Sequence, residues 1–210
     1  MVKRMLGLAV VLASVVSLFG SGCSVLQQAG STGGGESYFP HAQGNSWVMT
    51  GSDGGTETMT VEGTINVGGS NTAQKFCSCY MQNIGASAYT STGETYYQIN
   101  GTGAYYWGNS GYVFPAAYTM FPFSLEVGKS WDMIASGSPT VKGIVVAREN
   151  VAVPAGTFDC YKLALVATYV LPGGTSETET EYYWLGDNAG FVKLASSSST
   201  VETVLTWKNF

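Results

Sequence analysis

Three carboxylates, Glu177, Glu179 and Glu181, alternate with threonines near the end of the chain. On an extended strand, residues two apart point to the same face at intervals of roughly 7 Å. That interval falls within the separation that inverting glycosidases use for their acid and base. Such enzymes place the two carboxylates across a cleft, however, whereas these three follow one another along a single strand. The pattern therefore favours an exposed strand face that protects a sheet edge against aggregation over a catalytic pair or a calcium site.

Apart from Cys23, the chain has three cysteines, Cys77, Cys79 and Cys160, and two of them could form a disulfide. Cys77 and Cys79 lie two apart on one predicted strand, so their side chains share a face and cannot bond to each other without strain. Either could bond to Cys160 on a neighbouring strand, which would leave one free thiol. The alternative is that all three are buried and reduced, as small apolar side chains. Because no Cys-x-x-Cys motif and no histidine cluster occur, we expect no metal site and no redox centre.

Other catalytic and cofactor-binding motifs are missing from the sequence. The one histidine, His41, has no evident partner and is expected to be solvated. Gly128-Lys129-Ser130 has Phe123 where a phosphate loop has its first glycine, so this segment is predicted to be a turn. No Gly-x-Ser-x-Gly nucleophile motif occurs. We therefore expect no catalytic residues and no cofactor, and we predict that the protein is not an enzyme.

An aromatic-rich segment is the one candidate binding site. Ten of the 27 aromatic residues lie between Tyr96 and Phe123. Adjacent tyrosines such as Tyr105 and Tyr106 point to opposite faces of a strand, so some of them leave the main core. The segment is either a core layer with cross-strand aromatic pairs or an exposed groove for an acyl chain, a glycan or a protein partner. The residues that we expect to line such a groove are Tyr97, Tyr105, Trp107, Tyr112 and Phe114.

The elements that must position these residues are predicted to be strands. Short runs rich in Val, Thr, Tyr and Trp alternate with period two, whereas no long stretch has apolar residues at helical spacing. The clearest runs are 58–67, 75–82, 140–147, 158–170 and 178–185. Glycine, asparagine and aspartate mark turns between them. The sequence predicts an all-β, antiparallel domain, built as one curved sheet (a half-barrel) or as a two-sheet sandwich.

The two halves of this domain repeat one another in sequence. Four short matches occur in the same order in both halves. They pair Gly44-Asn45-Ser46-Trp47 with Gly128-Lys129-Ser130-Trp131, Val61-Glu62-Gly63 with Val141-Lys142-Gly143, Cys79-Tyr80 with Cys160-Tyr161, and Tyr96-Tyr97 with Tyr182-Tyr183. The matches indicate an internal duplication of about 80 residues. The alternative is that aromatic-rich antiparallel strands resemble one another through composition alone.

The first 22 residues are predicted to be a lipoprotein signal peptide. Lys3 and Arg4 precede an apolar run over 5–19, which is too short for a stable spanning helix and typical of an export signal. Small residues over 20–22 then lead to Cys23, which suits cleavage before Cys23 and lipid attachment to it. The same spacing would also serve an ordinary signal peptidase.

The expected mature chain consists of a tether and one domain. Residues 23–37 are polar and Gly-rich, typical of a lipid-anchored flexible tether. Residues 38–210 form a single antiparallel β domain, long enough to bury a core. Ser24 follows the lipidated cysteine, and by resemblance to enterobacterial lipoproteins this indicates the outer membrane, on its periplasmic side.

The charge of the chain excludes one class of partner and limits another. Only 11% of residues are charged and the formal net charge is −5, against roughly 25% charged residues in a typical soluble domain. Without clustered lysines and arginines we expect no nucleic-acid partner. Removal of Lys3 and Arg4 makes the chain more acidic, which opposes docking on anionic lipid. The expected membrane link is therefore the lipid on Cys23.

The segment 151–163 (VAVPAGTFDCYKL) is the most specific string in the chain. Together with Phe39-Pro40 before Gly44-Asn45-Ser46-Trp47, and with Tyr183-Trp184-Leu185-Gly186 before Gly190-Phe191-Val192-Lys193, it resembles the TapB-like family of bacterial secreted and lipid-anchored proteins. The resemblance implies an envelope location and a curved antiparallel sheet like that of lipoprotein carriers. It brings no catalytic residues.

These observations predict a lipid-anchored protein of the bacterial cell envelope. We expect a non-catalytic binding module for a hydrophobic ligand, a glycan or an envelope protein. A purely structural envelope lipoprotein is the alternative, and a hydrolase that uses scattered carboxylates is a more distant one. The hydrolase gains support if Glu177 or Glu181 faces another carboxylate across a cleft.

Overall fold

The computed structural model describes residues 38–84, 87–137, 139–197, 199 and 201–210. The predicted signal peptide, Cys23 and the tether lie outside the described residues. The described chain forms twelve strands, and all five runs that alternate with period two lie within them. The first six strands are β1 Ser46–Gly51, β2 Thr56–Gly68, β3 Asn71–Ile84, β4 Ser87–Asn100, β5 Gly103–Asn109 and β6 Tyr112–Pro122. The other six are β7 Ser130–Ile134, β8 Thr140–Val153, β9 Gly156–Val170, β10 Ser176–Gly186, β11 Gly190–Ser196 and β12 Glu202–Lys208. No described helix is long and apolar enough to cross a membrane.

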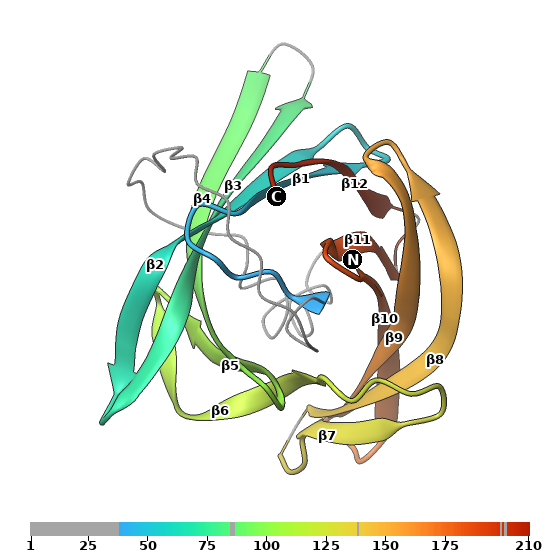
Figure 1. The fold of residues 1–210 in the computed structure, drawn as a ribbon. Helices are drawn as coiled ribbons and strands as arrows, with labels where there is room; N and C mark the ends of the chain where they lie inside the picture. The colour runs from blue at the N-terminus through green and yellow to red at the C-terminus, as the bar shows by residue number, and fades with distance from the viewer. Residues whose placement is uncertain (1–37, 85–86, 138, 198, 200) are drawn as a thin grey trace.

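All twelve strands belong to one sheet, in the order β6-β5-β4-β3-β2-β1-β12-β11-β10-β9-β8-β7. All eleven neighbouring pairs of strands are antiparallel. The sheet curves around a central space until its two end strands, β6 and β7, lie side by side (Figure 1). The prediction of a single curved antiparallel sheet is confirmed, and the two-sheet sandwich is excluded.

Strand alternation fills the concave face of the sheet with apolar side chains. Successive residues of a strand point to opposite faces, so every second residue of a run faces the interior. In β3, Phe76 is fully buried in the core, whereas Lys75 before it points to the convex face. The largest fully buried side chains of the core are Phe76, Phe121, Leu163, Leu165, Leu185 and Leu205. They come from both halves of the sheet, so the halves share one core.

The sheet order reveals that the two halves of the domain have the same architecture. Strands β6 to β1 are followed in the sheet by β12 to β7, so each half is a six-stranded meander with the same internal order. β-bulges occur at matching places: β2 has one between Val61 and Gly63, and β8 has one between Val145 and Ala147. Similarly, the pairing of β4 with β5 shifts register after Tyr96, and the pairing of β10 with β11 shifts register after Trp184. The structure therefore supports an internal duplication.

The structure also corrects the register of that duplication. The two Gly-x-Ser-Trp matches are equivalent in the structure, because the glycine that begins each one makes the same hydrogen bond. Gly44 N donates to Val61 O at 2.8 Å, and Gly128 N donates to Val145 O at 2.8 Å. Val61 therefore corresponds to Val145, not to the sequence match Val141. Cys160 pairs with Glu149 in the second half, which is the place that Ala73 takes opposite Ile65 in the first half. The two cysteine-tyrosine pairs are thus not equivalent positions.

A tryptophan bridges the seam between the two end strands. Trp131 in β7 donates its indole N–H to the carbonyl oxygen of Thr119 in β6, with 3.2 Å between the two heavy atoms. Its ring lies over Gly143 of β8, where a Cβ atom would overlap the ring. The glycine is therefore needed for the indole to lie flat enough to reach the opposite strand.

The segment before β1 enters the interior of the sheet (Figure 1). Phe39 is 2% exposed, and its ring contacts four aromatic rings from four different strands. These are Phe76 of β3, Tyr97 of β4, Phe121 of β6 and Phe191 of β11, at centroid distances of 5.3 to 5.7 Å. Phe39 therefore ties the two halves of the sheet together from within.

Candidate binding cavity

The interior of the sheet contains a cavity of about 340 Å³. Its walls come from both halves of the domain, because lining residues lie on β1, β2, β4, β5 and β6 and also on β10, β11 and β12. Most of the lining is apolar or aromatic: Met49, Met59, Met120, Tyr97, Tyr106, Phe191 and Leu194. A cavity of this size lies within the range of ligand sites, which begins at roughly 300 Å³.

The local sequence explains this lining. Met59 and Glu57 of β2 are in phase with the buried Val61, so all three point to the interior. Met49 of β1 lies opposite Glu57 in the strand register. Methionine side chains are flexible and polarisable, so the three lining methionines can adapt to the shape of a bound molecule. Because Tyr97 and Phe191 also contact the ring of Phe39, the cavity adjoins the N-terminal segment.

Glu57 is a buried carboxyl group in this apolar wall. Its Oε1 atom is buried and has no hydrogen-bond partner among the described residues. Burial removes the charged form from water and raises the pKa of Glu57 from its usual 4.5 to about 7. Its neighbours in the sheet register are Met49 of β1 and Tyr80 of β3, neither of which carries a positive charge. Glu57 is therefore an acceptor without a donor at the edge of an apolar cavity.

Glu181 is a second carboxyl group in the lining, on β10. Its Oε2 accepts a hydrogen bond from the hydroxyl of Tyr183 at 2.6 Å. Burial raises the pKa of Glu181, the Tyr183 hydrogen bond opposes this, and the charge of Glu179 adds to the rise. No lysine, arginine or histidine is among the residues that line the described cavity. The cavity is therefore apolar with an acidic component.

This arrangement changes the interpretation of the carboxylates on β10. Glu177 is exposed, as the sequence predicts. Glu179 is half-buried, and Glu181 lines the cavity. The prediction of a solvated strand face is therefore wrong for Glu181, because the sheet curves and turns this face of β10 inward. Glu57 and Glu181 line the same cavity from different halves of the sheet.

The structure does not bring the five predicted groove residues together. Tyr97 lines the cavity. Phe114 is half-buried against Tyr106 and Tyr118 at the core edge, and Tyr112 is 60% exposed. The hydroxyl of Tyr105 is hydrogen-bonded to Thr102 at 2.7 Å. Trp107 is buried on the convex face in a small cluster with Val67, Ala73 and Tyr96.

Sequence analysis missed the lining methionines and Glu57, and it placed Glu181 on an exposed strand face. A signal for Glu57 was present, because Glu57, Met59 and Val61 share one alternation phase in a predicted strand. An acidic residue in the apolar phase of a strand is unusual and marks a position of interest. For Met120 and Leu194 no comparable signal exists, since only the sheet order places β6 and β11 around the same space.

The possible disulfide between Cys160 and either Cys77 or Cys79 is not formed. None of the three cysteines that the structure describes is part of a disulfide. Cys160 is buried on β9, in the same alternation phase as Lys162, and Cys77 and Cys79 lie on β3, in the same phase as Lys75. Five strands separate β3 from β9 in the sheet. The alternative of reduced thiols is therefore the one that the structure supports.

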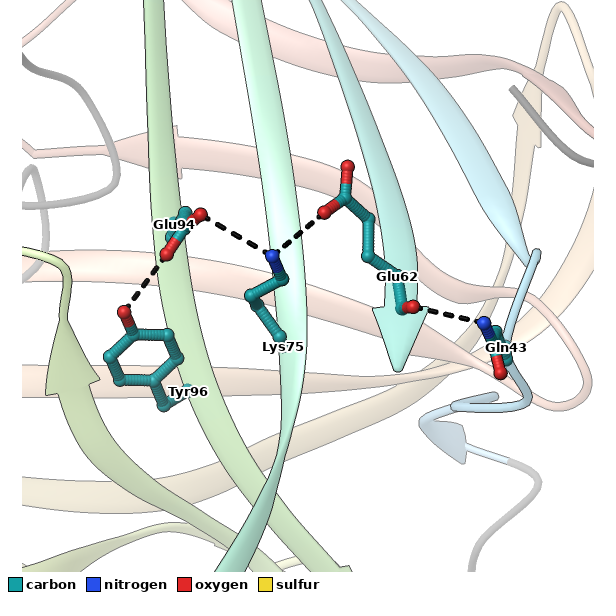
Figure 2. Close-up of polar contacts among 5 residues, drawn as sticks. All are labelled: Gln43, Glu62, Lys75, Glu94 and Tyr96. Atoms are coloured by element: carbon teal, nitrogen blue, oxygen red, sulfur yellow. Dashed lines mark hydrogen bonds and ion pairs between the residues drawn. The ribbon is translucent and has the colours of Figure 1, made fainter. Parts of the chain in front are cut away.

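A second set of charged residues, outside the cavity, forms a polar cluster on the convex face of the first half of the domain (Figure 2). Lys75 Nζ forms ion pairs with Glu62 at 2.9 Å and with Glu94 at 3.4 Å. Tyr96 donates its hydroxyl hydrogen to Glu94, and Gln43 donates to the carbonyl oxygen of Glu62. The hydrogen bond with Glu62 raises the pKa of Lys75. Each charged group of the cluster is paired with another member of it, so we assign the cluster a structural role.

The second half replaces this cluster by aromatic contacts. Lys162 occupies in β9 the place of Lys75 in β3, because each lies opposite the residue that follows a bulge. Its Nζ atom lies 4.7 Å from the ring centroids of both Tyr182 and Trp184. One lysine position is thus stabilised by carboxylates in one half and by cation–π contacts in the other. Among the described residues, no group of three or more His, Cys, Asp or Glu side chains could hold a metal ion.

Comparison with solved structures shows that this fold occurs elsewhere. A protein of Bacteroides fragilis, predicted to be exported and described as having a YmcC-like fold, aligns with a TM-score of 0.52 and 15% identity over 81% of this chain and 97% of that chain. A predicted lipoprotein of Parabacteroides distasonis covers the same shares, at 17% identity and a TM-score of 0.47. The first likeness shows a shared fold. No protein-family model and no curated protein matches the sequence, so the resemblance to the TapB-like family stays a prediction.

Proposed function

We propose that this protein is a binding module of the bacterial cell envelope that takes up a hydrophobic ligand in the interior of its curved sheet. The observation that carries this proposal is the cavity of about 340 Å³ walled by both halves of the domain. That volume is more than twice the roughly 150 Å³ that suffices to bind benzene in a protein core.

The lining favours an apolar chain over a glycan. Apolar and aromatic side chains form most of the walls, and the other lining residues are two glutamates and four serines or threonines. A glycan needs hydrogen-bond partners for many hydroxyl groups, and buried hydroxyls without partners are costly. An alkyl or acyl chain needs none. The three methionines also suit a ligand whose shape varies.

The envelope location rests on the leader and on the likeness to other proteins. The signal peptide and Cys23 predict export and lipidation. The Bacteroides fragilis protein that shares the fold is itself predicted to be exported. We expect anchoring in the outer membrane, facing the periplasm. Expression of Cys23→Ser in the native host tests this, because the variant is expected to leave the membrane fraction; a variant that stays there would contradict the lipid anchor.

Ligand uptake can be tested with a fluorescent apolar probe and a pocket-filling variant. Met59→Trp places a larger ring in the cavity, and Met81→Trp makes the same change at a residue of β3 that is 49% exposed. We expect the wild type and Met81→Trp to bind the probe and Met59→Trp to bind it at least tenfold more weakly. Equal binding by all three proteins would place the probe outside the cavity. Native mass spectrometry of gently purified protein would identify a resident ligand.

A hydrolase is the second candidate function. The specific observation in its favour is that Glu181 and Glu57 line one cavity, so a carboxylate of β10 does share a cavity with another carboxylate. The Tyr183 hydroxyl occupies one oxygen of Glu181, and the walls around Glu57 are apolar. Hydrolysis of chromogenic glycosides and esters by the wild type, with loss in both Glu57→Gln and Glu181→Gln, would favour the hydrolase over the binding module.

A further inference from the structure

We propose that the cavity selects ligands that carry a protonated amine on an apolar chain, and that Glu57 is the acceptor for this cation. The inference rests on the proposed function, because it specifies the chemistry of the ligand in the same cavity. Glu181 supplies a second negative charge from the other half of the sheet. The class of ligand is a cationic amphiphile with a primary ammonium group.

The first argument is the unpartnered oxygen of Glu57. A buried polar atom without a hydrogen bond costs roughly 1–3 kcal/mol, so proteins satisfy almost all such atoms. Glu57 Oε1 is buried and has no partner among the described residues, and Glu57 is one of the residues that line the cavity. Met49 and Tyr80, the neighbours of Glu57 in the register, do not supply one. A donor on the ligand would satisfy this atom.

The second argument is the sign of the charge in the cavity. Its lining contains two carboxyl groups and no cationic side chain. An anionic headgroup, such as a carboxylate or a phosphate, would add like charge to a site of low dielectric and is therefore rejected. A neutral alcohol could donate one hydrogen bond. An ammonium group can donate three and also neutralise the carboxylate, and such charge-assisted bonds are roughly twice as strong as neutral ones.

The third argument is the set of groups that surround Glu57. Apart from Glu181, the titratable groups that line the cavity with Glu57 or interact with it electrostatically are tyrosines of β3, β4, β5 and β10: Tyr80, Tyr97, Tyr106, Tyr182 and Tyr183. Burial raises the pKa of Tyr97 and of Tyr183, so both are neutral in the physiological range. No residue of the described lining therefore competes with a ligand cation for Glu57.

Proton balance then predicts how binding varies with pH. Below the pKa of Glu57, about 7, the carboxyl group holds a proton that an incoming ammonium group must displace into solvent. Affinity for an ammonium ligand should rise as pH increases from about 5 to 8. It falls again only where the amine itself loses its proton, near pH 10 for an alkylamine by analogy with lysine. A neutral ligand should lack this rise.

Three eight-carbon ligands test the proposal by displacement of the fluorescent probe: octylamine, octanol and octanoate. At pH 8 we expect octylamine to bind about tenfold or more tightly than octanol, and octanoate to bind most weakly. Glu57→Gln should remove most of the preference for the amine while octanol binds as before. Glu177→Gln, the same change at an exposed residue of β10, serves as the control and should leave all three affinities unchanged.

The outcomes separate this inference from the proposed function. If octanol and octylamine bind equally and Glu57→Gln changes neither, the cavity binds apolar chains but the amine selectivity is wrong. If octanoate binds best, the sign of the selectivity is wrong. If none of the three ligands displaces the probe from the wild type and native mass spectrometry finds no ligand, the proposed function itself fails. Thermal unfolding of each variant without ligand shows that the variant is folded.

Discussion

Replacement of Glu57 by glutamine should change how the stability of this protein depends on pH. Glutamine has nearly the same shape as protonated glutamic acid and does not titrate. In the folded protein burial raises the pKa of Glu57 from 4.5 to about 7. The folded state therefore keeps a proton on Glu57 up to about pH 7, whereas the unfolded chain releases it near pH 4.5. Between these values the folded state binds more protons, so the free energy of unfolding falls as pH rises.

The size of the effect follows from the shift. One pKa unit corresponds to about 1.4 kcal/mol, so the shift of Glu57 costs about 3 kcal/mol of stability above pH 7. Below pH 4.5 both states are protonated and nothing is lost. Glu57→Gln should therefore match the wild type at pH 4 and exceed it by up to about 3 kcal/mol at pH 8. The pKa of Glu181 is also raised, so both proteins keep a smaller loss of the same sign.

Urea unfolding of the mature protein at pH 4, 5, 6, 7 and 8, followed by tryptophan fluorescence, measures this difference. Glu177→Gln, at an exposed position of β10, is the matched control and should run parallel to the wild type. The decisive quantity is the gap between the variant and the wild type, which should open between pH 4.5 and 7. A gap that is constant over the whole range, or that closes as pH rises, would refute the buried-carboxyl argument.

Three further changes probe the packing of the interior. Phe39→Ala removes four ring contacts at once and should cost about 3–5 kcal/mol in urea unfolding; a loss below about 1 kcal/mol would mean that the N-terminal segment is not part of the core. Gly143→Ala forces a methyl group into the ring of Trp131 and should lower stability by about 1–3 kcal/mol, whereas Gly101→Ala, which has open space around it, should not. Burial raises the pKa of the Cys160 thiol to about 12, so with the other cysteines replaced it should react with a thiol reagent only on unfolding. Rapid labelling of the folded protein would contradict this placement.

Sequence patterns located the strands because alternation is a local property. A residue that must face a core repeats every second position, and this is visible in the runs at 58–67 and 158–170 without any knowledge of partners. The Trp47 and Trp131 motifs also identified the start of each half correctly. The later match of Val61 with Val141 was out of register, because the hydrogen bonds of Gly44 and Gly128 make Val145 the equivalent of Val61. Valine, glycine and tyrosine recur along alternating strands, so short matches of these residues can align two strands at a wrong offset.

The candidate site was harder to predict, since its parts come from strands that are far apart in the chain. Glu57 could have been found as an acidic residue in the apolar phase of β2. The aromatic segment drew attention by composition, but only Tyr97 of the five expected residues lines the cavity. Residues such as Trp107 fill a second cluster on the convex face, because neighbouring residues of a strand point in opposite directions.

The sequence by itself predicted that this chain is all-β and antiparallel and indicated a duplication, because these features depend on residue alternation, turn residues and short repeats. It did not determine the curvature of the sheet. Only the tertiary structure decided that β2 and β10, with β1, β12 and β11 between them, contribute carboxyl groups to one cavity. Curvature arises from the sum of strand twist, bulges and core packing over all twelve strands. For that reason Glu181, which looked like one of three solvated carboxylates, is part of the lining of an interior site.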